Sequence, residues 1–157
     1  MRTFLVSILL ISAVPAFAAD KDECIVDAGP NDVVKKKGDV IIEAGQTVED
    51  AISLDGMVVI KAGAKVKSAV SFHGSVVVED GATVKETALA VGGIVTVSKG
   101  AKVKSVVEVS ERGIRVKGDD GDDIDVNLKI GGKSIGQRIA DEALVKMKNC
   151  KITASAK

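Results

Sequence analysis

Hydrophobic and polar residues alternate along the middle of the chain, and one pattern is written four times between Gly38 and Val109. The copies begin at Gly38, Gly56, Gly74 and Gly93, which are 18, 18 and 19 residues apart. Alternation with a period of two indicates a strand and not a helix. A repeat this short cannot bury its own apolar side, so successive copies must stack on one another. The pattern therefore predicts a solenoid.

Stacked in register, the copies align their hydrophobic residues in columns on three sides. Each copy is expected to supply three short strands that end at glycines or polar pairs. Such a coil is a short parallel β-helix of about four 18–19-residue coils, of either hand, filled by Val, Ile, Leu and Ala. The columns are Val40-Val58-Val76-Val95, Ile42-Ile60-Val78-Val97, Gln46-Ala64-Ala82-Ala101, Val48-Val66-Val84-Val103, Ile52-Val70-Leu89-Val107 and Leu54-Phe72-Val91-Val109.

The first eighteen residues have the pattern of a secretory signal peptide. Arg2 precedes a short apolar run, and Ala16-Phe17-Ala18 offers a small-residue exit with a predicted cut after Ala18. The run is short for a bilayer span, and no later stretch approaches one. The mature chain is therefore predicted to be periplasmic or secreted, without a transmembrane segment. The predicted organisation is signal peptide 1–18, N-terminal cap segment 19–37, β-helix 38–117, and C-terminal strand and helix 118–157.

Two further elements are expected after the repeats. Residues 124–130 alternate as a strand, and residues 134–149 have helical periodicity with Ser134 as the N-cap. The acidic run 118–123 could bind calcium, but it lacks the spacing of an EF-hand loop, and a turn between two strands is favoured. The helix is expected to pack along the β-helix through Ile135, Ile139, Leu144 and Met147, with Ala140 and Ala143 beside them.

Cys24 and Cys150 are the only cysteines. In an exported protein two cysteines indicate one disulfide. Four coils at about 4.8 Å each span about 19 Å, and a 16-residue helix spans about 24 Å. The helix can therefore run back along the solenoid and bring Cys150 to Cys24. An intramolecular bond is favoured, and a bond that joins two subunits is the alternative.

The composition argues against several kinds of partner. Without Arg2, 21 basic and 22 acidic side chains remain, which gives no general attraction to nucleic acid or anionic lipid. Phe72 is the only aromatic residue of the predicted mature chain. Stacking platforms for bases or sugars are therefore missing, and neither nucleic-acid nor the usual carbohydrate binding is predicted.

Outward-facing positions of the repeats also form columns. Glu43, Lys61 and Glu79 alternate in sign one coil apart, so they are expected to pair. Five lysines share another face and are a candidate partner-binding face for an anionic partner. The alternative, which is favoured, is a solvated face that keeps a sheet-rich surface soluble. These residues are Lys65, Lys67, Lys85, Lys102 and Lys104.

His73 is the single histidine and the one candidate catalyst. It lies at a predicted corner in line with Asp55, near Gly92, and spacing alone assigns it no partner carboxylate. A solvated turn residue is favoured over a catalytic base. Neither a nucleophile motif, a metal-ligand cluster nor a phosphate loop occurs in the sequence. No enzymatic activity, catalytic residue, metal site or cofactor is predicted.

Residues 88–97 (ALAVGGIVTV), the following GAKVK at 100–104, and VVIKAGAKVK at 58–67 resemble the bactofilin group of polymer-forming β-helix proteins and its cell-envelope relatives. The resemblance covers residues 38–109. It implies a right-handed β-helix that assembles end to end as a scaffold at the cell envelope.

Three functional hypotheses follow. The first is a non-enzymatic, exported structural or scaffolding β-helix that binds itself end to end or binds an envelope protein or polymer. The second is a monomeric periplasmic binding or adhesion module that uses the lysine-rich face. The third, a remote alternative, is an enzyme similar to the hexapeptide acyltransferases, which are also β-helices and can use a histidine base.

Overall fold

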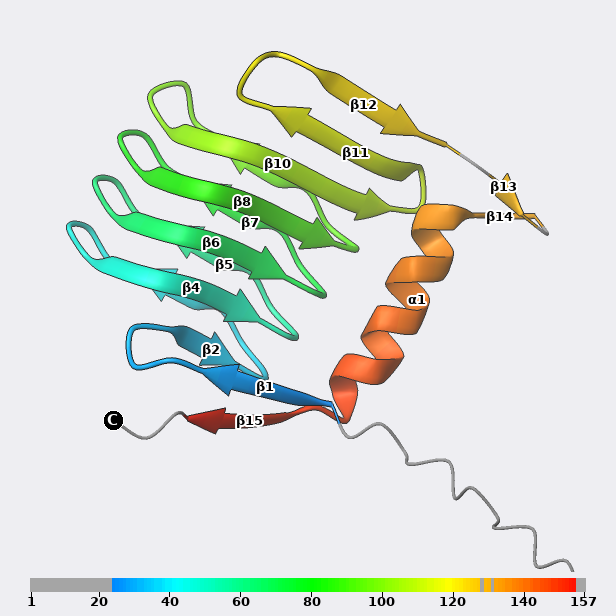
Figure 1. Cartoon of the computed structure of the whole chain (residues 1–157), viewed down its shortest axis with the longest axis horizontal. Coiled ribbons are helices and arrows are strands. Elements are labelled where there is room, and N and C mark those ends of the chain that lie inside the picture. The colour runs from blue at the N-terminus through cyan, green and yellow to red at the C-terminus, as the bar shows by residue number, and fades with distance from the viewer. Residues whose placement is uncertain (1–23, 128, 131, 155–157) are drawn as a thin grey trace, which may run out of the picture.

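The computed structural model of the chain describes residues 24–127, 129–130 and 132–154. Within these residues the predicted fold class is confirmed. Parallel strands stack in about four coils as a β-solenoid, and C-terminal strands and one helix lie against it (Figure 1). The predicted signal peptide at 1–18 lies outside the described residues.

Each coil contains one short and one long strand, where three short strands were predicted. The short strands form a four-stranded small sheet, and the long strands form most of a seven-stranded large sheet. The second and third predicted sides are therefore one continuous, bent strand. The short strands are β3 (Val40–Ile42), β5 (Val58–Ile60), β7 (Val76–Val78) and β9 (Val95–Val97). The long strands are β4 (Thr47–Ser53), β6 (Lys65–Ser71), β8 (Thr83–Val91) and β10 (Lys102–Ser110).

The columns of the first two sides pair in register and fill the tube as predicted, except at Gln46 and Val97, which are exposed. Val58 lies between Val40 and Val76 in the small sheet, and all three side chains are fully buried. On the second side, Val66 pairs with Val84 and both are buried. Because β-branched side chains pack well on a pleated surface, four stacked copies produce one continuous apolar interior.

The third predicted side is in register but faces outward, so its assignment to the interior is wrong. Val70 is only partly buried, whereas its neighbours Ala69 and Ser71 are fully buried. The reason lies at the bend of the long strand, where neither Lys67 nor Ser68 is buried, so the alternation of inward and outward residues moves by one position between Val66 and Ala69. Ala or Ser occupies the inward positions of this side in β4, β6 and β8, whereas Val106 and Glu108 hold the equivalent positions of β10.

The glycines that begin the copies stack directly on one another at a corner. A Cβ added to Gly74 would lie 2.5 Å from the carbonyl oxygen of Gly56, and one added to Gly93 would meet the carbonyl of Gly74 in the same way. Atoms cannot approach so closely without displacement of the backbone. The repeat therefore requires glycine at this corner to keep the spacing of the coils.

Additional strands extend the large sheet beyond the four coils. β2 (Val33–Lys35) precedes β4, and the antiparallel hairpin of β11 (Gly113–Gly118) and β12 (Asp123–Val126) follows β10. The acidic run forms the turn of this hairpin, as favoured, and the amide of Gly118 donates to the carbonyl of Asp122 at 3.0 Å. Residue 128 of the predicted strand lies outside the described residues. The small strands β13 (Lys129–Ile130) and β14 (Lys133–Ser134) pair with each other before the helix.

Helix α1 (Ile135–Lys148) forms where predicted, with Ser134 as its N-cap accepting from the amide of Gln137 at 3.1 Å. Its packing face agrees with the prediction except at one residue: Ala140 is buried and Ile135, Ala143, Leu144 and Met147 are partly buried, whereas Ile139 is 41% exposed. Gly136, which was not predicted to pack, is also buried, and its small size permits a close approach of the helix to the sheet.

The predicted intramolecular disulfide joins Cys24 and Cys150, 126 residues apart, with their Cα atoms 4.5 Å from each other. As expected, α1 runs back along the solenoid from the β11–β12 end to the N-terminal end (Figure 1). There β1 (Ile25–Ala28) pairs in parallel with β15 (Lys151–Ala154). The two ends of the described chain are thus linked by one covalent bond and one strand pair.

Candidate functional site

The five predicted lysines lie together on the outside of β6, β8 and β10, and all five are exposed. Lys65 and Lys102 flank Thr83 in successive strands. Lys67 approaches Glu86 at 4.0 Å, whereas the other four take part in no ion pair within the described part of the chain. We call Lys65, Lys67, Lys85, Lys102 and Lys104 the lysine columns.

The alternating column on the small sheet forms one close pair. Lys61 Nζ lies 2.8 Å from Glu79 Oε1, one coil away, as the charge alternation predicts. The hydrogen bond and the opposite charge raise the pKa of Lys61, and the hydrogen bond from Lys61 lowers the pKa of Glu79. Both side chains are more than a third exposed, so this pair adds little to stability.

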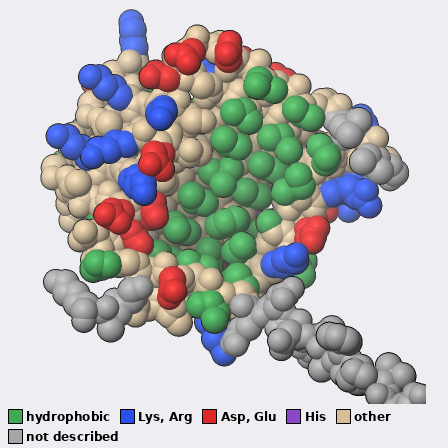
Figure 2. All heavy atoms as spheres, viewed as in Figure 1, with side chains coloured by type: hydrophobic (Ala, Val, Ile, Leu, Met, Phe, Trp, Pro, Cys, Tyr) green, Lys and Arg blue, Asp and Glu red, His purple; other side chains and the backbone are tan. Residues whose placement is uncertain are grey.

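A continuous row of aliphatic side chains crosses the outer face of the large sheet. The sequence pattern did not predict that these side chains form a surface. Cross-strand pairing places these residues side by side from β2 to β12. Six are partly buried and the last is 57% exposed. Figure 2 shows hydrophobic side chains gathered over the middle of this face, with charged side chains to their left. We call this row the apolar ladder: Val34, Ile52, Val70, Leu89, Val107, Val116 and Ile124.

A second aliphatic row runs beside the apolar ladder, and α1 covers it. Val91 and Val109 pair in neighbouring strands and are 4% and 7% exposed, and they pack with Ala140 of the helix. Phe72 and Ala143 pack against the same cluster. The outer face of the large sheet therefore has one row covered by the chain's own helix and one row left open.

His73 has a carboxylate partner that spacing alone did not assign. Its Nδ1 lies 2.9 Å from Asp55 Oδ1, one coil below. Both side chains are more than half exposed at the corner between the sheets, beside a hollow lined also by Leu144 and Met147. The solvated-corner interpretation fits this geometry better than the catalytic one.

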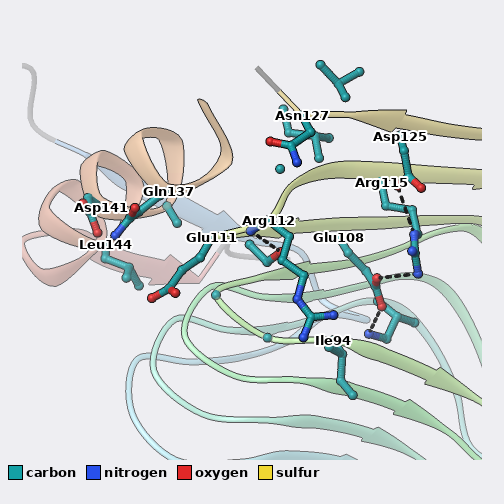
Figure 3. A pocket seen from close by; sticks show the side chains of 18 of the residues that line it. Ile94, Glu108, Glu111, Arg112, Arg115, Asp125, Asn127, Gln137, Asp141 and Leu144 are labelled. Carbon is teal, nitrogen blue, oxygen red and sulfur yellow. Dashed lines mark hydrogen bonds and ion pairs between the residues drawn. The ribbon is translucent and has the colours of Figure 1, made fainter. Parts of the chain in front are cut away.

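A hollow of about 820 Å³ lies at the β11–β12 end of the tube. It occupies the space beside β9 where a fifth short strand would continue the small sheet. Figure 3 shows Glu108, Arg112 and Arg115 around it, below the β11–β12 hairpin. Its lining mixes both signs of charge, so no single class of small ligand is favoured by charge.

An ionic chain at this end covers the edge of the small sheet. The amide of Val95 in β9 donates to Glu108 Oε1 at 2.7 Å, and Arg115 Nη1 lies 3.9 Å from Glu108 Oε2. Arg115 also donates to Asp125 at 3.1 Å, and this hydrogen bond raises its pKa above the usual value. Because Glu108 occupies an edge amide, it opposes the addition of a further strand to β9.

No group of three His, Cys, Asp or Glu residues in the described part of the chain comes together as metal ligands. No helix in the same residues is long and apolar enough to cross a membrane. Comparisons with protein-family models, with curated proteins and with solved structures give no significant match to this chain.

Proposed function

We propose that the protein is a non-enzymatic structural module of the cell envelope that binds other proteins through the outer face of its large sheet. The apolar ladder is the observation that carries this proposal. A contiguous exposed apolar patch of a few hundred Å² is often a functional interaction surface. The disulfide is compatible with an oxidising compartment, which supports the export predicted from residues 1–18.

Assembly by end-to-end stacking is less well supported by the geometry. A second copy that continued the small sheet beyond β9 would have to place its own long strand beside β10. That position is filled by β11, and β12 lies beyond it. At the other end Val40 and Ile42 are fully buried, and Val33 of the N-terminal segment packs on the core. The bactofilin resemblance stays a prediction about the repeat, and here the added strands oppose stacking.

Site-specific photo-crosslinking in cells that make the protein tests this proposal. A photoreactive residue in place of Val70 is expected to form adducts with an envelope protein. The matched control is Ile41, which is 45% exposed on the outer face of the small sheet. Equal adduct formation at both positions, or none at Val70, would contradict docking through the large sheet.

A further inference from the structure

The apolar ladder lies between α1 on one side and the lysine columns on the other, and we call this strip of the sheet face the groove and its two borders walls. One wall is α1, whose Ile139 and Ala143 are four residues apart and therefore share one side of the helix. Gln137 and Asp141, on the opposite side of α1, line the hollow at the β11–β12 end, and Ala143 packs with Leu89 and Val107 against the cluster of Val91, Val109 and Ala140, so the side with Ile139 and Ala143 faces the apolar ladder. Ile139 is 41% exposed and adds an aliphatic side chain to that wall.

The other wall is formed by the lysine columns. Between them and the apolar ladder lies a strip of short polar side chains, in which Asp50 pairs with Ser68 and Thr87 pairs with Ser105. Short side chains allow a partner backbone to approach the sheet. The five lysines occupy the middle of this wall, on β6, β8 and β10. Carboxylates lie among them at Glu86 and at the two ends of the wall, at Glu49 and Asp50 and in the acidic turn 118–123 beside Ser105.

The chain's own helix shows what this sheet accommodates. α1 crosses the strands and packs on the row that contains Val91 and Val109 through small residues. The apolar ladder is two residues along each strand from that row, a distance of about 7 Å. Neighbouring packed helices lie about 8–10 Å apart. A second helix beside α1 would therefore lie on the apolar ladder with its axis displaced by about 1–3 Å toward the strip of short side chains next to the lysine columns.

The length of the groove and its backbone chemistry favour a helix over other occupants. Seven strands at about 4.8 Å span about 29 Å, which a helix of about 19 residues covers. A helix satisfies its own backbone hydrogen bonds, whereas an extended segment laid on a sheet face would not. A strip of roughly 29 Å by 10 Å is about 300 Å², well below the ~800 Å² per partner of a stable dimer. A second copy of this chain is therefore a poor occupant.

We propose that the groove binds an amphipathic helix of a partner protein, with an aliphatic stripe on the apolar ladder and acidic side chains beside Lys67, Lys85 and Lys104. This inference rests on the proposed function and gives the class of the partner. The aliphatic stripe supplies the burial of apolar surface. The acidic flank sets the orientation, because the lysine columns lie along only one wall of the groove and four of these lysines take part in no ion pair among the described residues.

A pair of designed peptides tests the inference with the folded, oxidised protein. Both are 19-residue amphipathic helices with a Leu and Ala stripe, and one has Glu and the other Lys along the same flank. Fluorescence anisotropy is expected to show at least tenfold tighter binding of the Glu peptide. Val70→Glu is expected to weaken that binding at least tenfold, and the control Ile41→Glu is expected to leave it unchanged.

Charge reversal distinguishes a specific orientation of the bound peptide from nonspecific binding. The double change Lys85→Glu with Lys104→Glu is expected to reverse the preference toward the Lys peptide. The control double change Lys99→Glu with Lys129→Glu alters exposed lysines outside the lysine columns and is expected to preserve the preference for the Glu peptide. Equal affinity for both peptides in the unchanged protein would overturn the inference.

Two further outcomes separate this inference from the proposed function. If Val70 gives crosslinks in cells but neither peptide binds, the helical partner is wrong and docking through the large sheet stands. If phosphatidylglycerol vesicles bind the protein and Val70→Glu abolishes that binding, the face meets lipid and both proposals fail. We expect no vesicle binding, since the net charge of the chain is near zero.

Discussion

The tube and the layer packed on it are specified in different ways. In the tube, each residue of a copy meets its equivalent one coil away, so one short pattern repeated four times determines the packing. The outer layer of α1, the β11–β12 hairpin and β15 has no repeat and meets the tube through Gly136, Ala140 and the disulfide. The comparison teaches that the repeat produces a rigid support, whereas the unique segments determine which of its surfaces stay open.

The disulfide gives the largest expected effect on this comparison. Replacement of both Cys24 and Cys150 by Ser opens a loop of 126 residues and is expected to lower the free energy of unfolding by about 4 kcal/mol. Urea denaturation measures this change. Hydrogen exchange is expected to show that amides of α1 lose protection before those of β7. Simultaneous loss of protection in α1 and β7 would contradict the separation of the tube from the outer layer.

A cavity in the tube has the next largest expected effect. Ile60 is fully buried, so Ile60→Ala is expected to cost about 3 kcal/mol through lost burial and the cavity left behind. Ile139→Ala on the outer layer is the matched control and is expected to cost about 0.5 kcal/mol, because its side chain is 41% exposed. Thermal denaturation of both variants checks the difference, and equal costs would refute it.

Gly136 tests how closely the outer layer approaches the tube. Helix propensity alone predicts that Gly136→Ala stabilises α1 by about 1 kcal/mol. The added Cβ would meet the carbonyl oxygen of Ser110 and lie 2.5 Å from that of Gly113. We therefore expect a loss of about 2 kcal/mol in the free energy of unfolding, because the helix must move away from the sheet. A stabilised variant in urea denaturation would show that the close contact is absent.

The buried hydroxyl groups of the tube give a smaller effect. Ser71 Oγ donates to the carbonyl of Gly56 at 2.8 Å and is fully buried. Ser71→Ala leaves that acceptor without its donor and is expected to cost about 1 kcal/mol. Ser68→Ala, on the outward side of the same strand, is expected to cost less than about 0.5 kcal/mol. Calorimetry of the two variants compares them, and the opposite order would reverse the assignment of inner and outer faces.

The smallest expected effect is the pH dependence of the Lys61–Glu79 pair. Because the folded-state pKa of Glu79 is lowered, its contribution is present above the ordinary carboxyl pKa and is lost as the pH falls through the folded value. The raised pKa of Lys61 means that its contribution is lost at high pH. Glu79→Gln should slightly reduce the loss of melting temperature between pH 7 and pH 3. A larger loss of melting temperature in this variant than in the unchanged protein would contradict the contribution that the pKa shifts predict for the pair.

Much of the tube and the disulfide could be predicted from the sequence, because both depend on spacing. Equivalent positions 18 or 19 residues apart must stack, and the length of α1 brings Cys150 to Cys24. The inward or outward direction of Val70 could not be predicted, since it depends on a bend that hydrophobicity does not mark. The alternation shifts at that bend, so an apparent core column became the apolar ladder.

Some parts of the candidate site could be predicted from the sequence and others could not. Lysine spacing was sufficient to place the lysine columns on one exposed face. Glu108 gave no local signal, because its role at Val95 depends on the end of the tube and on the hairpin that brings Arg115. The contact of His73 with Asp55 was within reach of the sequence, since the two residues occupy equivalent positions of successive coils.

Sedimentation velocity across a wide concentration range tests the central claim, that this solenoid is a discrete module which acts through its lateral face. The experiment uses the chain without residues 1–18, with and without reductant. We predict one monomeric species at every concentration in both conditions, because β11 and β12 occupy the stacking position. Filaments that lengthen with concentration would show that the ends associate and would contradict this account.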